Sequence, residues 1–116
     1  MTAMQNSLPL EIDCHQTAAK LRQKLEDFLL IDCREEDEHA IAHIDAARLI
    51  PMSQIMPRAA ELEAWRDKHV VVHCHHGGRS MKVTQWLRSQ GFDLAQSMAG
   101  GIDAWSQHID PSVPRY

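Results

Sequence analysis

The stretch HVVVHCHHGGRSMKVTQWLRSQG, residues 69–91, decides the fold of this chain. It opens on the run 69–72, in which three consecutive valines stand between polar residues. Such runs are typical of strands that are buried on both faces of a parallel sheet. Apolar residues then recur at helical spacing over 80–89, and Gly91 is a helix stop signal. The stretch therefore predicts a strand, a short loop and a helix in succession.

The same alternation of apolar runs and amphipathic segments continues along the rest of the chain. A second strongly apolar run, 28–31, predicts another buried strand. Weaker strand candidates lie at 10–12, 47–50 and 95–98. Helical spacing predicts further helices at 17–25, 59–65 and 102–107. Strands that alternate with helices indicate an α/β fold with a mainly parallel sheet.

The length of the chain, 116 residues, is typical of one domain. Because the sequence contains no repeat and no linker, we expect a single domain over 1–116. Its core is expected to run from about residue 10 to 105, followed by a proline-containing tail over 106–116. Apolar residues make up 44% of the chain, which is enough to bury a core.

Charge and cysteine content argue against several classes of protein. The net charge is −4 and no cluster of Lys or Arg occurs, so we expect no nucleic-acid partner. Residues 1–10 lack the pattern of a signal peptide, and the apolar runs are too short to cross a bilayer. These features predict a cytoplasmic protein without membrane contact. Three widely spaced cysteines do not suggest a disulfide framework, which leaves a thiol free for chemistry.

The loop after the strand at 69–72 combines features that favour a reactive thiolate. Cys74 lies at the carboxyl end of the strand, where ligands bind in open parallel sheets. Gly77 and Gly78 allow backbone N–H groups to form an anion-binding nest. The helix that begins near Ser80 directs its positive end at the thiol, and Arg79 adds a permanent charge. A buried structural cysteine before an ordinary strand-to-helix turn would produce the same pattern.

This loop resembles the active-site loop of the rhodanese superfamily, which reads Cys, four residues, Arg, then Ser or Thr. LIDCRE at 30–35 resembles the family motif (L/I)-I-D-V-R-E, and the His-Ile and Ile-Pro pairs at 43–44 and 50–51 follow as in the family. MAGGIDAW at 98–105 resembles the motif L-x-G-G-x-x-A-W. The three motifs occur in family order with family spacing, and the resemblance extends over about 10–105.

The resemblance implies a five-stranded, mostly parallel sheet with helices on both faces, and a sulfurtransferase activity. The Cys74 thiolate would take a sulfane sulfur from a donor such as thiosulfate and hold it as a persulfide. It would then pass the sulfur to cyanide, a thiol or a protein thiol, in two covalent steps. No cofactor is implied beyond that persulfide. The loop that binds the substrate corresponds to His75, His76, Gly77, Gly78, Arg79 and Ser80. Asp32 and Arg34 match the neighbouring motif and are expected to hold the walls of the site through ion pairs.

The chain departs from the family pattern at a few positions. Ala42 replaces a glycine, Asp45 and Ala46 replace Pro-Gly, and all three shape a loop away from the sulfur. Cys33 replaces a common valine. It could act as a resolving thiol that converts the persulfide to a disulfide, although a small buried hydrophobic residue is the favoured interpretation.

Two other functions are alternatives to sulfur transfer. Related phosphatases have five residues between Cys and Arg, whereas four separate Cys74 from Arg79, and position 80 is Ser. No aspartic acid is obviously placed as a general acid, so a phosphatase or an arsenate reductase is disfavoured. A rhodanese-fold binding or regulatory module is the second alternative. Such modules often lose the cysteine, and here Cys74, Arg79 and the glycines are all present.

Other polar residues receive structural interpretations. His73, His75 and His76 flank the cysteine and are potential metal ligands. Structural zinc sites, however, usually pair ligands at two separated locations, so we expect no metal and place His75 and His76 at the mouth of the pocket. The acidic run 35–38 is expected to be the solvated start of a helix, where negative charge suits the helix dipole.

The tail suggests a class of partner. Residues 109–116 resemble the ends of rhodanese domains that are fused to enzymes activating sulfur-carrier proteins. The resemblance implies small sulfur donors and thiol acceptors, and it adds a sulfur-carrier protein or a cysteine desulfurase as candidate protein partners. We expect a monomer, because the chain is small and shows no long apolar patch.

Overall fold

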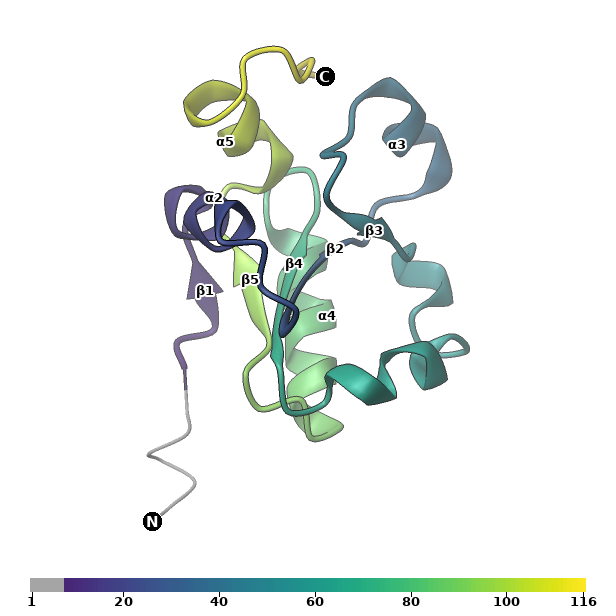
Figure 1. Ribbon diagram of the computed structural model, residues 1–116. Helices are drawn as coiled ribbons and strands as arrows, with labels where there is room; N and C mark the ends of the chain where they lie inside the picture. The colour runs from purple at the N-terminus through teal and green to yellow at the C-terminus, as the bar shows by residue number, and fades with distance from the viewer. Residues whose placement is uncertain (1–7) are drawn as a thin grey trace.

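The computed structural model describes residues 8–116 of the chain. Most of residues 1–10, on which the prediction about a signal peptide rests, lies outside that range. Five strands form one sheet in which every neighbouring pair runs parallel, in the order β1-β5-β4-β2-β3 (Figure 1). The strands are β1 (Glu11–Ile12), β2 (Phe28–Asp32), β3 (Arg48–Leu49), β4 (His69–His73) and β5 (Gln96–Met98). The predicted five-stranded parallel sheet is thus confirmed.

Helices cover both faces of this sheet. They are α2 (Cys14–Arg22), α3 (Glu36–Ile41), α4 (Gly78–Ser89) and α5 (Gly101–His108), with two 3-10 helices, η1 (Met52–Gln54) and η2 (Ala59–Trp65). Helix α4 packs on β4 and β5, whereas α2 and α5 lie together on the opposite face (Figure 1). Within residues 8–116, no helix combines the length and the apolar character needed to cross a bilayer.

The helices predicted at 17–25 and 59–65 differ most from the structure. Helix α2 begins at Cys14 and ends at Arg22, three residues before the predicted bounds at each end. The Asp13 carboxylate caps its start by accepting a hydrogen bond from the Gln16 N–H at 2.7 Å. Residues 59–65 form a 3-10 helix in place of the expected α-helix. This segment is a short connector held to the core through one buried side chain, Leu62, and short connectors often adopt this tighter geometry.

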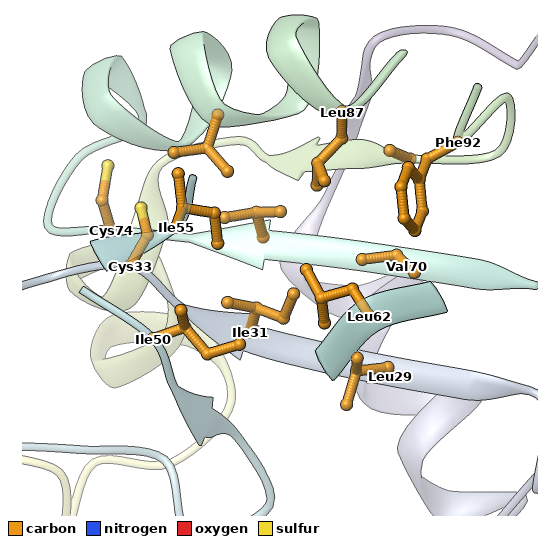
Figure 2. Packing of buried hydrophobic residues seen from close by; sticks show 13 residues of the cluster. Leu29, Ile31, Cys33, Ile50, Ile55, Leu62, Val70, Cys74, Leu87 and Phe92 are labelled. Atoms are coloured by element: carbon orange, nitrogen blue, oxygen red, sulfur yellow. The ribbon is translucent and has the colours of Figure 1, made fainter. Parts of the chain in front are cut away.

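The core consists of two hydrophobic clusters, one on each face of the sheet. Leu29 and Ile31 of β2 belong to the cluster under α4, which Figure 2 shows from close by. Phe28 and Leu30 of the same strand belong to the cluster under α2 and α5. Alternate side chains therefore serve opposite faces, which explains why β2 is an unbroken apolar run. This double burial fixes the central strands, and their carboxyl ends carry the candidate site.

Candidate active site

The site is built where the two central strands end side by side. Strands β2 and β4 pair in register from Phe28 with His69 to Asp32 with His73. The chain after β2 then enters α3, and the chain after β4 enters the loop that leads to α4. Cys74 is the first residue beyond β4 and is almost completely buried. The structure thus places the cysteine at the sheet edge that the sequence indicated.

The Cys74 sulfur is held by the loop and by the start of α4. Its Sγ accepts hydrogen bonds from the backbone N–H groups of Gly77 at 3.1 Å and Ser80 at 3.3 Å, and it lies 3.4 Å from the Ser80 Oγ. Gly77 adopts a φ of 123°, which L side chains rarely adopt, so glycine is required to turn its N–H toward the sulfur. Of the N–H groups from 75 to 80, these two contact the sulfur.

These contacts make Cys74 an acidic thiol. Its pKa is lowered to about 4, first by the neighbouring Cys33 thiol. Burial acts in the opposite direction, and the Ser80 hydroxyl with the N–H groups of Ser80 and Gly77 adds to the lowering. The proximity of Cys74 and then burial raise the pKa of Cys33 in turn, so its thiol stays protonated beside the thiolate. The pair therefore carries one negative charge at neutral pH, on Cys74.

We expect the thiolate of Cys74 to persist far below neutral pH. An ordinary cysteine titrates at about 8.5. Because the pKa of Cys74 is lowered to about 4, its thiolate remains above that pH and disappears as the pH falls through it. The stabilisation that the thiolate gives to the fold is complete above the ordinary thiol pKa of about 8.5. It is lost progressively as the pH falls from there through about 4. The difference in ultraviolet thiolate absorbance between wild type and Cys74→Ser measures this titration, and a midpoint near 8.5 would contradict it.

Arg79 is oriented differently from the expectation that its donors face an anionic substrate. Its guanidinium forms two hydrogen bonds to the carboxylate of Glu38, at 2.6 and 2.8 Å. This contact with Arg79, opposed by burial, lowers the pKa of Glu38 to about 2. The sequence predicts a solvated acidic run at 35–38, and for Glu38 this is wrong, because its side chain reaches across to Arg79 in the loop region after β4. An anion that binds Arg79 must therefore compete with an internal carboxylate.

Asp32 and Arg34 form a buried ion pair beneath the site. Both side chains are fully buried, and Arg34 donates to the two carboxylate oxygens at 2.9 and 2.6 Å. Burial alone would raise the pKa of Asp32, but the hydrogen bonds from Arg34 outweigh it and leave the pKa lowered. Further donors of Arg34 reach the carbonyl oxygens of Glu38 and Ala42. Arg34 thus ties the middle and the C-terminal end of α3 to the end of β2.

An aromatic stack lies at the mouth of the loop. The His75 ring packs between those of His76 and Tyr116, with ring centroids 3.9 Å apart in each pair. The Tyr116 hydroxyl accepts a hydrogen bond from Arg34 at 2.9 Å and donates one to Glu38 at 3.0 Å. The sequence placed both histidines at the mouth, but it missed Tyr116. No local signal connects a residue of the tail to a loop so far away along the chain.

The start of α5 contacts the first residues of the loop that follows β4. The N–H groups of Ile102 and Asp103 donate to the carbonyl oxygens of Cys74 at 2.9 Å and His75 at 3.2 Å. Gly101 lies directly against these carbonyls with a φ of 58°. In the sequence the GG pair at 100–101 is only a family signature, and the structure assigns this contact to Gly101.

One cluster of potential metal ligands lies beside the loop. The potential ligand atoms of His75, His76 and Asp103 lie within 4.8 Å of one another, which is close enough to hold a metal ion. The expectation that the protein binds no metal therefore stays a prediction. The Asp103 carboxylate accepts a hydrogen bond from Arg115 at 2.9 Å, and His73 lies buried near Asp32, apart from this cluster.

Comparisons with known proteins cover most of the chain. The family model of the rhodanese-like domain covers residues 17–108. A sulfurtransferase of Allochromatium vinosum is 36% identical over 103 residues, which cover 89% of this chain and 94% of that protein. The thiosulfate sulfurtransferase GlpE of Coxiella burnetii is 32% identical over 85 residues, or 73% of this chain and 78% of that protein.

Other comparisons extend these matches to longer proteins and to solved structures. The chain spans about a third or less of the length of the first curated relatives that it matches, among them the adenylyltransferase and sulfurtransferase MOCS3 of Arabidopsis thaliana, which is 29% identical. That match covers 96% of this chain and 27% of the relative. A rhodanese-like domain protein from Staphylococcus aureus superposes with a TM-score of 0.76 at 27% identity, covering 93% of this chain and 99% of that one.

Proposed function

Because this chain belongs to the rhodanese-like family, we propose that it is a sulfurtransferase that carries a sulfane sulfur as a persulfide on Cys74. The observation that carries the proposal is the acidic, buried thiol of Cys74 within the loop that leads into α4. Two backbone N–H groups, of Gly77 and Ser80, are directed at its sulfur. They stabilise negative charge without a metal or a cofactor, as a thiolate nucleophile and a persulfide anion both require.

The first step loads the sulfur. The Cys74 thiolate attacks the outer sulfur of a donor such as thiosulfate, and a new S–S bond forms. The S–S bond of the donor breaks, and its electron pair leaves with sulfite. The charge then lies on the outer sulfur of the Cys74 persulfide. The name of the Coxiella burnetii relative supports thiosulfate as one donor, and competition with Glu38 for Arg79 will weigh against any anionic donor that binds weakly.

The second step transfers the sulfur from the Cys74 persulfide to an acceptor. A nucleophilic acceptor, such as cyanide or a thiol, attacks the outer sulfur, and Cys74 leaves as a thiolate. An acidic thiol is a good leaving group, so the lowered pKa of Cys74 favours this step as well as the first. Two successive covalent steps through one enzyme form predict ping-pong kinetics.

A protein acceptor is the finer part of the proposal. The relatives include proteins whose names join an adenylyltransferase to a sulfurtransferase, which supports delivery to a sulfur-carrier protein. His75, the residue after Cys74, stacks with His76 and Tyr116, so this aromatic stack adjoins the residue that the acceptor must reach. A loaded protein that passes sulfur to small thiols but never to a carrier protein would contradict this part alone.

The test is the intact mass of protein incubated with thiosulfate and freed of excess donor. We expect the wild type, measured immediately after the donor is removed, to gain the mass of one sulfur atom and Cys74→Ser to gain none, because serine offers no thiolate. Cyanide should reverse the gain and release thiocyanate. Mercaptopyruvate and the persulfide of a cysteine desulfurase are tested in parallel as alternative donors. Absence of an adduct with all three donors would overturn the proposal in favour of a binding module.

A further inference from the structure

Two thiols meet at the ends of the central strands. The last register pair of β2 and β4 is Asp32 with His73, and the next residues are Cys33 and Cys74. The N–H of Cys33 donates to the carbonyl of His73 at 3.0 Å, so the ladder continues by one step. Neighbouring strands lie about 4.8 Å apart, and disulfides join Cα atoms about 4.4–6.8 Å apart. The backbone spacing therefore permits a bond between these cysteines.

The two side chains also share one face of the sheet. Cys33 continues the alternation of Leu29 and Ile31, and Cys74 continues that of Val70 and Val72, all within the cluster under α4. Figure 2 shows the sulfur atoms of Cys33 and Cys74 next to each other at the edge of this cluster. Both residues are buried, so the protein encloses the contact between them.

Resting on the proposed function, we propose that Cys33 is a resolving thiol that discharges the Cys74 persulfide as hydrosulfide. The Cys33 sulfur attacks the inner sulfur, Cys74 Sγ, and a Cys33–Cys74 disulfide forms. The bond between the inner and outer sulfurs breaks, and its electron pair leaves with the outer sulfur. The thiol proton of Cys33 passes to the departing sulfur or to solvent, and the sulfur leaves as hydrosulfide. No external oxidant is needed. A thiol reductant then restores both cysteines.

The position of the negative charge allows Cys33 to react only after Cys74 has been loaded with sulfur. Before loading, the Cys74 thiolate lies beside the Cys33 thiol and raises its pKa, so Cys33 keeps its proton. Loading moves the negative charge from Cys74 Sγ to the outer sulfur, which removes the partner that held the proton. Cys33 then competes with the external acceptor for the persulfide. The persulfide thus has a limited lifetime whenever no acceptor is bound.

The experiment follows the mass of the loaded protein without oxygen. Wild type, Cys33→Val and Cys14→Ala are loaded with thiosulfate or mercaptopyruvate and freed of donor, and no acceptor is added. Cys14 is the matched control, because it is also buried and free but lies in the cluster on the opposite face. We expect wild type and Cys14→Ala to lose the added sulfur and two hydrogen atoms, and to release one hydrosulfide per chain. Cys33→Val should keep its sulfur.

A second measurement does not depend on the variant. Peptide mapping of discharged wild type under non-reducing conditions should recover a peptide pair joined through Cys33 and Cys74, and dithiothreitol should separate it. Unloaded wild type, kept alongside, should retain its reduced mass. If loaded wild type holds its sulfur as long as Cys33→Val and yields no joined pair, Cys33 is a packing residue and the inference is overturned. If no variant gains sulfur, the proposed function itself fails, which is a distinct result.

Discussion

Replacing Arg34 by alanine is expected to destabilise the fold by about 3–5 kcal/mol, because it leaves the Asp32 carboxylate buried without its partner. Both side chains are fully shielded from solvent. The substitution also removes the donors to Ala42 and Tyr116, so the carbonyl that ends α3 and the hydroxyl of the tail lose their contacts. Since small domains are stable by only about 5–15 kcal/mol, this is a large share of the total. Equilibrium unfolding in urea measures the loss.

The exposed pair of Arg58 and Glu61 provides the matched control. Its atoms approach as closely, at 2.8 Å, but the side chains are 32% and 47% exposed. Exposed ion pairs contribute about 0–1 kcal/mol, so Arg58→Ala should leave the free energy of unfolding almost unchanged. If Arg34→Ala and Arg58→Ala cost the same, the cost of burying the Asp32 charge would not depend on Arg34, and the role of this pair in the walls of the site would be refuted.

Patterns that repeat along the chain allowed most of the fold to be predicted. The runs at 28–31 and 70–72 are apolar at every position because their side chains alternate between two clusters. That signal is local, and it places both strands in the centre of the sheet. The position of Cys74 follows from it, since the cysteine directly succeeds one of these strands. The sequence also indicated Gly77 as part of an anion-binding loop.

The contacts that complete the site could not be predicted in this way. Glu38 meets Arg79 only because α3 and the loop before α4 are brought together at the same edge of the sheet. Tyr116 reaches Arg34 from the other end of the chain. Both are single contacts between distant segments, and charge or aromatic character alone does not identify the partner. The adjacency of Cys33 and Cys74 is intermediate, because it follows from strand order and register once these are known.

Replacing Gly101 by alanine is expected to reduce sulfur transfer about 100-fold, a loss comparable to the effect of a displacement of about 1 Å at a reacting group. A Cβ at this position would lie 2.5 Å from the carbonyl oxygen of Cys74 and would also clash with that of His75. Overpacking costs about 1–3 kcal/mol, and a left-handed alanine adds about 1–2 kcal/mol. We expect the loop to move in response to this clash, which changes the distance between the sulfur and the N–H of Gly77. The rate of persulfide loading, measured at a temperature where the variant is folded, tests this expectation.

The control for Gly101 is Gly78, where an added Cβ meets no heavy atom within 4 Å and the backbone needs no left-handed conformation. In the first turn of α4, alanine is expected to raise the free energy of unfolding by up to about 1 kcal/mol over glycine. Opposite signs of the two stability changes would show that the close approach of α5 to the loop, and not the loss of a glycine as such, is responsible. If Gly101→Ala loads sulfur at the wild-type rate, α5 does not hold the catalytic loop, and the thiolate of Cys74 must be positioned by the start of α4 alone.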